Sequence, residues 1–180
     1  MISEIEAGLE AWKTTIDVQK HFNELSMKVR GLAVTVLAAF LAASGYSLES
    51  DFQIVFLDLS VSLTGLILLA AFVCWTAFYL MDRLWYHRLL AATVAHGRAI
   101  EAKLLPDVPT IGLTSGIDEA SPILGLRARH RLSIFYGFFG ALLFVGAGLA
   151  MTASWPFYLA GASIAFLILV LEVVSAKSNK

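Results

Sequence analysis

Residues 132–171 are LSIFYGFFGALLFVGAGLAMTASWPFYLAGASIAFLILVL, a run of forty residues without one charged side chain. A single helix of that length would measure about 60 Å, twice the roughly 30 Å apolar core of a bilayer. The run must therefore fold back on itself. The predicted turn is Thr152-Ala153-Ser154-Trp155-Pro156, because proline is favoured at the first position of a helix. Two membrane spans are expected, near Leu132–Met151 and near Phe157–Val174.

Two further uncharged runs precede this one. Gly31–Leu48 has eighteen residues, close to the minimum for crossing a bilayer, and Leu59–Met81 has twenty-three. A cleaved signal peptide is the alternative for the first run, but an acidic amphipathic segment of about thirty residues is too long for the leading region of such a peptide. The chain is therefore expected to be an all-α membrane protein with four transmembrane helices in two hairpins.

The distribution of basic residues predicts the orientation. Four lie in residues 1–30, seven in residues 82–131 and two after residue 174, which accounts for all thirteen; the two short turns hold none. The positive-inside rule assigns all three regions, and both termini, to the cytoplasm. The expected segments are a cytoplasmic amphipathic helix (1–30), a first transmembrane hairpin (31–81), a cytoplasmic helix and loop (82–131), a second transmembrane hairpin (132–174) and a cytoplasmic tail (175–180).

Composition agrees with a membrane protein. Apolar residues make up 58% and charged residues 15% of the chain, so a large apolar surface must face lipid or a partner. A net charge of −1 argues against binding of nucleic acid through its phosphates. The one cysteine, Cys74, lies in an apolar run, and no disulfide within the chain is possible.

The amino-terminal segment is patterned as an amphipathic helix. Ser3 and Glu6 form a predicted capping box that opens it. Apolar residues recur three and four apart on one face, at Ile5, Leu9, Trp12 and Ile16, and then move to a second line, at Val18, Phe22, Leu25 and Val29. The first face continues as the polar residues Gln19, Asn23 and Ser26. Such a helix needs a partner: another helix, another copy or the membrane surface.

The central segment is expected to extend the second span into the cytoplasm. Trp85–Leu105 is rich in helix-forming residues, with Leu104 on its apolar side and Glu101 on its polar side. Pro106 then ends the helix, and residues 106–121 are expected to be a loop that packs on the cytoplasmic helices. Because this loop is apolar, it is the predicted contact for a cytoplasmic protein partner, through Ile111, Leu113 and Ile117.

No catalytic, metal or cofactor site is predicted. His87 and His96 are nine residues apart and so lie on opposite faces of one helix, and no histidine pair has the four-residue spacing that grips one metal ion. The sequence has no glycine-rich phosphate loop, no CxxC and no nucleophile elbow. An enzyme is not expected, and neither is a bound cofactor.

Asp58 is the residue that most strongly suggests a pathway for an ion or solute. It is followed on nearly the same predicted helical face by Ser62 and Gly65. Ionisable groups at membrane depth usually face a bundle interior or water. Asp58 also lies near the outer end of its span, where an interfacial position explains it equally well, so both interpretations stay open.

Small residues along the predicted spans favour close helix packing, within the chain or between copies in a homo-oligomer. The first span carries Ala38 and Ala42, four residues apart. The third carries Gly137, Ala141 and Gly148 on one line.

Two stretches resemble a known family. Trp12–Leu37, WKTTIDVQKHFNELSMKVRGLAVTVL, and Arg83–Leu90, RLWYHRLL, resemble the opening of small transmembrane effectors of bacterial anti-phage systems of the retron and abortive-infection type. The resemblance implies a bacterial inner-membrane protein that disrupts the bilayer on activation, and a partner that restrains it. The four-span pattern departs from the two-span plan common among such effectors.

Three functions follow as hypotheses. The first is an oligomeric, pore-forming or membrane-perturbing effector controlled through its cytoplasmic helices. The second is a membrane scaffold that anchors a cytoplasmic partner. The third is a small channel or transporter that uses Asp58.

Overall fold

The computed structural model describes residues 3–50, 52–56, 59–120 and 128–152, together with residues 157, 158, 161, 164 and 165. These residues are helical apart from one short β-hairpin and the connecting turns. They belong to two compact units. The first comprises Met1–Thr35 and Trp75–Gly137, and the second comprises Val36–Cys74 and Phe138–Lys180.

Three helical stretches are long and apolar enough to cross a membrane, namely Glu4–Glu49, Leu63–Leu104 and His130–Ala150. They include the first expected span, all but the first four residues of the second, and all but the last residue of the third. The fourth expected span, near Phe157–Val174, lies mostly outside the described residues. The prediction of a largely helical chain is therefore confirmed, and three of its helices are long and apolar enough to span a membrane.

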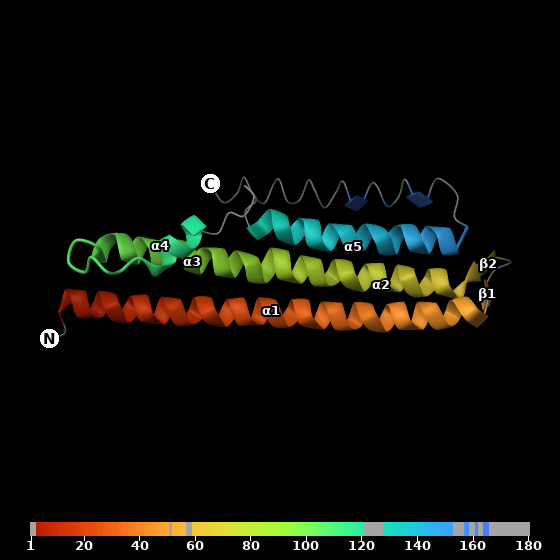
Figure 1. Ribbon diagram of the computed structural model, residues 1–180, viewed down its shortest axis with the longest axis horizontal. Coiled ribbons are helices and arrows are strands. Elements are labelled where there is room, and N and C mark those ends of the chain that lie inside the picture. Colours follow the sequence, from red (N-terminus) through yellow and green to blue (C-terminus); the bar gives the residue numbers. More distant parts are fainter. Residues whose placement is uncertain are drawn as a thin grey trace. The chain divides into compact units, whose positions relative to one another are not determined.

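In the first unit, the amino-terminal part of α1 (Glu4–Ser50) lies beside α3 (His87–Leu104), as Figure 1 shows. The π-helix η1 (Met81–Tyr86) joins α3 to the preceding helix α2 (Leu63–Leu80). The short helix α4 (Leu113–Ala120) packs against α3.

The capping box at the start of α1 is confirmed. The Ser3 hydroxyl accepts a hydrogen bond of 3.2 Å from the Glu6 amide, and the Glu6 carboxylate accepts one of 2.9 Å from the Ser3 amide. Two amides that the first turn would leave without partners are thereby satisfied.

Residues 113–120 form α4 and not the loop that the sequence predicts. Gly112 has φ +156°, a backbone conformation that L side chains rarely adopt, and it turns the chain into the helix. The Glu101 carboxylate then accepts hydrogen bonds from the Thr114 and Ser115 amides. This cap comes from a distant residue, so local sequence does not reveal it. Ser121-Pro122, the predicted start of a following helix, lies outside the described residues.

In the second unit, a β-hairpin stands where part of the second span was expected. Strand β1 (Gln53–Phe56) pairs antiparallel with β2 (Leu59–Ser62), with Gln53 opposite Ser62. Helix α2 consequently begins at Leu63, and the predicted start at Leu59 is wrong. Ile54, Val55 and Val61 are β-branched and favour strand conformation.

Helix α5 (Ala128–Ala150) matches the third expected span, and the turn that follows it begins at Met151. Thr152 adopts φ +49°. Beyond the turn, the Phe157 ring stacks on Phe144 of α5 at 4.5 Å. Gly148 lies against Tyr158, and Gly161 lies against Phe144.

Candidate functional site

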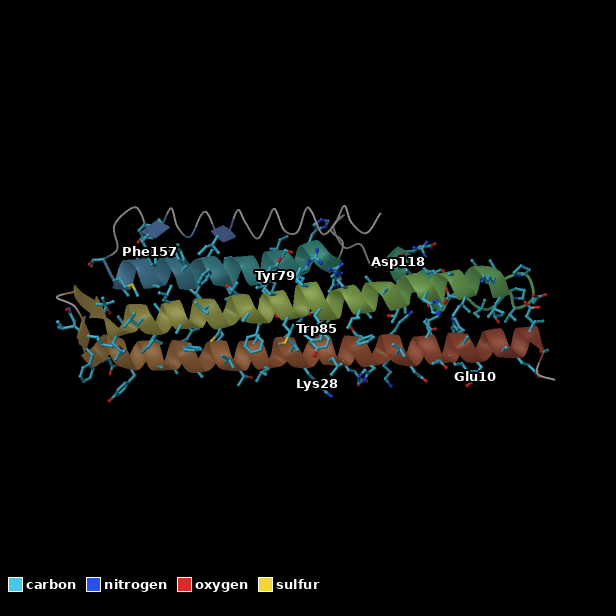
Figure 2. All side chains as sticks on the ribbon, turned by 180° about the vertical axis from the view of Figure 1, so that it is seen from behind. Glu10, Lys28, Tyr79, Trp85, Asp118 and Phe157 are labelled. Carbon is cyan, nitrogen blue, oxygen red and sulfur yellow. The ribbon has the colours of Figure 1, made fainter. Side chains whose placement is uncertain are left out.

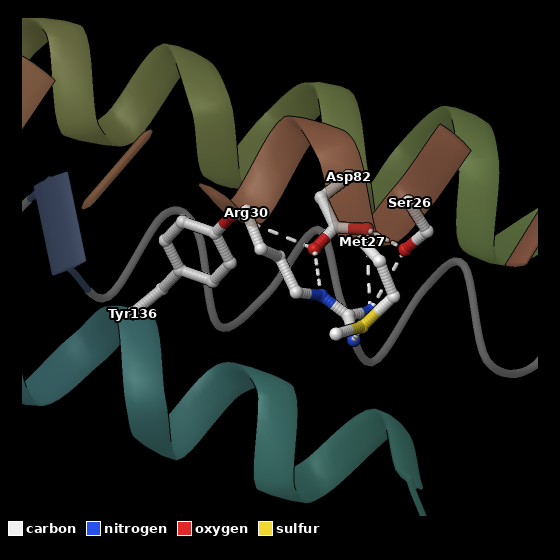
Figure 3. A network of polar contacts seen from close by, with 5 residues as sticks. All are labelled: Ser26, Met27, Arg30, Asp82 and Tyr136. Carbon is white, nitrogen blue, oxygen red and sulfur yellow. Dashed lines mark hydrogen bonds and ion pairs between the residues drawn. The ribbon is translucent and has the colours of Figure 1, made fainter. Parts of the chain in front are cut away.

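The most deeply buried charge in the described part of the chain is Asp82, which is 0% exposed and lies on η1 in the first unit. The Ser26 hydroxyl donates a hydrogen bond of 2.6 Å to Asp82 Oδ1, and Arg30 Nε donates one of 2.7 Å to Oδ2 (Figure 3). Arg30 also donates to the Ser26 oxygen at 2.9 Å, and the Tyr136 hydroxyl approaches Oδ2 at 3.5 Å. One carboxylate thus ties α1, η1 and α5 together within this unit.

Aromatic packing holds Tyr136 in this network. Its ring lies 4.9 Å from Trp75 and 5.4 Å from Tyr79. The Trp75 indole donates a hydrogen bond of 2.8 Å to the Tyr136 carbonyl, which fixes α5 against the end of α2 in this unit. The Tyr136 hydroxyl therefore meets Asp82 without freedom to swing away.

The ion pair is asymmetric. The Asp82 side chain is fully buried, whereas the Arg30 side chain is 33% exposed and keeps part of its hydration. Buried ion pairs contribute little net stability, since the cost of removing both charges from water offsets their attraction. Their better attested role is to fix one register between helices. A π-helix at the same place inserts an extra residue per turn, and such turns are frequent at functional sites.

A second buried carboxylate, Glu101 on α3, lies farther along the same unit and is 3% exposed. It accepts hydrogen bonds from the Trp12 indole at 3.0 Å, from the Thr114 and Ser115 amides at 2.7 and 2.9 Å, and from the Ser115 hydroxyl at 2.8 Å. Burial raises the pKa of Glu101, but these hydrogen bonds outweigh it and lower the pKa from 4.5 to about 2. Glu101 is therefore a carboxylate at neutral pH and joins α1, α3 and α4.

Between the two carboxylates, the Gln19 side chain donates a hydrogen bond of 3.0 Å to the Thr93 carbonyl. Trp12, Gln19 and Ser26 thus contact their partners at intervals of seven residues along α1. This is the period of an antiparallel coiled-coil seam, with polar groups at positions that are ordinarily apolar. Polar seam residues specify register at a cost in stability.

Gly97 allows the close packing at the centre of this seam. A β-carbon at Gly97 would lie 2.8 Å from Gln19 Nε2 and 2.9 Å from Thr114 Oγ1. That Thr114 hydroxyl is buried, and among the described residues it has no hydrogen-bond partner. The close approach of α1, α3 and α4 at this point therefore requires glycine.

Two of the three predicted pathway residues belong to the described part of the chain. Asp58 lies outside the described residues, and Ser62 ends strand β2. Gly65 is on α2 in the second unit, and a β-carbon there would lie against the Met151 side chain and the Ala147 carbonyl. The strand at residues 59–62 breaks the helical spacing on which the prediction depended.

The predicted packing residues differ in their surroundings. Gly148 is buried against Tyr158. The other four are exposed in the monomer: Ala38, Ala42, Gly137 and Ala141. A side chain at Gly137 would meet open space. On the predicted partner contact, Ile111 is buried, while Leu113 and Ile117 are 51% and 59% exposed.

Sequence reasoning missed both carboxylates. The sequence pattern does not single out Asp82, and its prediction that Glu101 lies on the polar side of its helix is wrong. One signal was present for Glu101: it lies three residues before Leu104 and four after Gly97, on the buried face. For Asp82 the signal was Arg30, the basic residue at the start of the neighbouring span.

Among the described residues, no three His, Cys, Asp or Glu side chains gather closely enough to hold a metal ion. Comparisons with protein-family models, with curated proteins and with solved structures found no match. The polar seam and the apolar helices are therefore the features from which a function is inferred.

Proposed function

We propose that this chain is a membrane-perturbing effector of the bacterial inner membrane, whose cytoplasmic helices control what its spans do to the bilayer. The observation that carries the proposal is the buried Asp82–Arg30 pair in the π-helix that directly follows the apolar helix α2. In this proposal the protein has four spans in two hairpins, cytoplasmic termini, and more than one copy in its active form. Its opening segment resembles anti-phage effectors, which supports a role in defence.

Contacts around α5 support the second hairpin. Phe157 and Gly161 both contact Phe144, and Tyr158 contacts Gly148, so residues later in the chain meet earlier positions of α5. That order is expected for a chain that reverses direction after Thr152. The distribution of basic residues supports the orientation.

The polar seam supports control through the cytoplasmic helices. A seam of apolar side chains would be more stable, whereas polar pairs at Trp12, Gln19 and Ser26 favour one register. A partner that moves α1 relative to α3 must break the contacts of Asp82, the group nearest the apolar part of α2. Binding in the cytoplasm would thereby change the packing of the spans, as a two-state element requires.

The direct test is membrane permeability. Purified protein in sealed liposomes of anionic lipid should release a trapped dye, and its overproduction should depolarise cells stained with a potential-sensitive dye. Asp82→Asn should shift the leakage rate several-fold. Asp118→Asn is the matched control, because it also breaks a 2.7 Å ion pair with an arginine, Arg98, but at the exposed surface. Sealed liposomes together with polarised cells would overturn the proposal.

A membrane scaffold is the second candidate, favoured by the exposed apolar residues of α4. Leu113 and Ile117 are large, exposed and held in place through Glu101. They fit a contact with a cytoplasmic protein partner. A scaffold would leave the membrane potential unchanged, so the same dye experiment separates the two candidates.

The channel hypothesis stays a proposal without support from the described residues. Asp58 lies outside them, and Gly65 is packed against Met151 and Ala147. An Asp58→Asn variant with altered conduction would revive it.

A further inference from the structure

The α1–α3 pair of the first unit has an open groove on the side away from α4. The groove measures about 890 Å³ and is lined by Glu6, Ala7, Glu10, Ala11, Thr14, Thr15 and His96. Figure 2 shows Glu10 on α1 and Asp118 on α4 at opposite edges of this unit. Helix α4 therefore covers one side of the pair and leaves the other side uncovered among the described residues.

Two helical stripes face this groove. On α1 the groove residues Ala7, Ala11 and Thr14 continue at intervals of three and four as Val18, Phe22 and Leu25. This line is distinct from the polar seam that binds α3. On α3, His96 belongs to an exposed line with the same spacing: Leu89, Ala92, His96, Ala99 and Lys103. Most of these side chains are small or apolar.

Exposed charges flank the two stripes. Along α1, four exposed carboxylates lie on one line at intervals of four and seven residues: Glu6, Glu10, Asp17 and Glu24. Along α3, Arg88 and Lys103 are exposed, and the one acidic residue, Glu101, is buried against α4. Lys13, Lys20 and Lys28 alternate with these carboxylates along α1, whereas the exposed charges of α3 are all basic.

We propose that a second copy of this chain occupies the groove and completes an antiparallel four-helix bundle. A twofold axis along the helix pair places α1 of one copy beside α3 of the other. Within one copy, Gly8 packs on Leu104 and Gln19 bonds to Thr93. Because the axis runs along the helices, the same residues of α1 and α3 are level with each other between the two copies. Glu10 is thus level with Lys103 of the second copy, and Glu24 with Arg88.

This arrangement uses every feature of the face. The two apolar stripes meet in the bundle core, the small residues allow close approach, and Glu10 and Glu24 meet Lys103 and Arg88 of the other copy. Flanking charges of this kind set partner and orientation in helical bundles. The interface goes beyond the proposed function and fails separately from it, since copies that associate in this way need not permeabilise a bilayer.

Disulfide trapping between two tagged copies tests the interface. Both copies carry Cys74→Ala; one carries Ala11→Cys and the other Ala99→Cys. Mild oxidation in native membranes should yield a heterodimer that carries both tags. The matched control pair, Asn23→Cys with Ala91→Cys, is exposed and nearly level but lies off both stripes. It should yield at least about fivefold less product.

Charge reversal gives an independent measurement. Glu10→Lys or Lys103→Glu alone should weaken self-association in detergent by about fivefold to tenfold, because each exposed pair occurs twice in a symmetric dimer. The two reversals combined should restore it. Equal trapping of both cysteine pairs would indicate random collision, and no trapping of either would indicate that another protein or the lipid surface covers the groove. Each of these outcomes, and a failure of the double reversal to restore association, would overturn the proposal.

Discussion

The Trp12 indole donates a hydrogen bond of 3.0 Å to the Glu101 carboxylate, although eighty-nine residues separate the two in sequence. The same carboxylate binds two amides at the start of α4. Trp12 on α1 is thereby linked to α4 through the buried Glu101 carboxylate, although α1 and α4 are far apart in the sequence. The contacts of this carboxylate set the first prediction.

Glu101 should make the stability of the first unit dependent on pH. Its pKa is about 2 in the folded protein against 4.5 ordinarily, so its stabilisation is complete above pH 4.5 and is lost as the pH falls toward 2. The full effect is on the order of 3 kcal/mol. Thermal unfolding in detergent should show the loss for wild type between pH 5 and 2. Glu101→Gln should be less stable at pH 7 and should lack this acid dependence; an unchanged profile would contradict the assignment.

Gly97→Ala should destabilise the seam. The added methyl group would lie within 3 Å of both Gln19 Nε2 and Thr114 Oγ1, and overpacking of this kind costs roughly 1–3 kcal/mol. Gly116→Ala on α4 is the control, because a β-carbon there meets nothing within 4 Å. In an exposed helical position that change should stabilise by about 0.5–1 kcal/mol. Urea unfolding of the two variants measures the difference.

Arg30→Gln should be more harmful than removal of both partners of the ion pair. It leaves the fully buried Asp82 without a countercharge, at a cost of roughly 3–5 kcal/mol. The double variant Arg30→Met with Asp82→Leu should recover most of that stability, because it removes both buried charges. If the proposed function holds, the double variant should nevertheless lose controlled leakage. Thermal unfolding should therefore show recovered stability in the double variant, while dye release from liposomes should show lost activity.

Gly65, a predicted pathway residue, and Gly137, a predicted packing residue, should respond differently to substitution by alanine. Gly65→Ala places a methyl group against Met151 and 3.2 Å from the Ala147 carbonyl, and should lower the unfolding temperature. Gly137→Ala should leave folding unchanged, because open space surrounds that position. A marked loss of stability at Gly137 would indicate that this face packs against another copy.

The helices were predictable because their signals are long and local. Uncharged runs located the three described helices that are long and apolar enough to span a membrane, and Ser3 with Glu6 located the start of α1. The β-hairpin was missed because strands of four residues carry little signal inside an apolar stretch. Helix α4 was missed because its cap, Glu101, comes from another helix.

The candidate site was less predictable than the fold. A sequence pattern cannot show that Ser26 and Arg30 meet Asp82, since the pairing depends on the register of two helices more than fifty residues apart. The polar continuation of the first face of α1 at Gln19 and Ser26 was visible in the sequence. The structure supplies its meaning, because these polar residues belong to the buried seam and the apolar line at Val18 and Phe22 does not.

The long sequence separation of the Trp12–Glu101 pair has a consequence for biosynthesis. At about 5–20 residues per second, Trp12 leaves the ribosome several seconds before Glu101 exists. During that time the amino-terminal part of α1 has none of its α3 or α4 partners, while its apolar and acidic lines are already complete. The proposed interface needs α3 as well as α1, so copies can pair in this way only after residues 87–104 have been made.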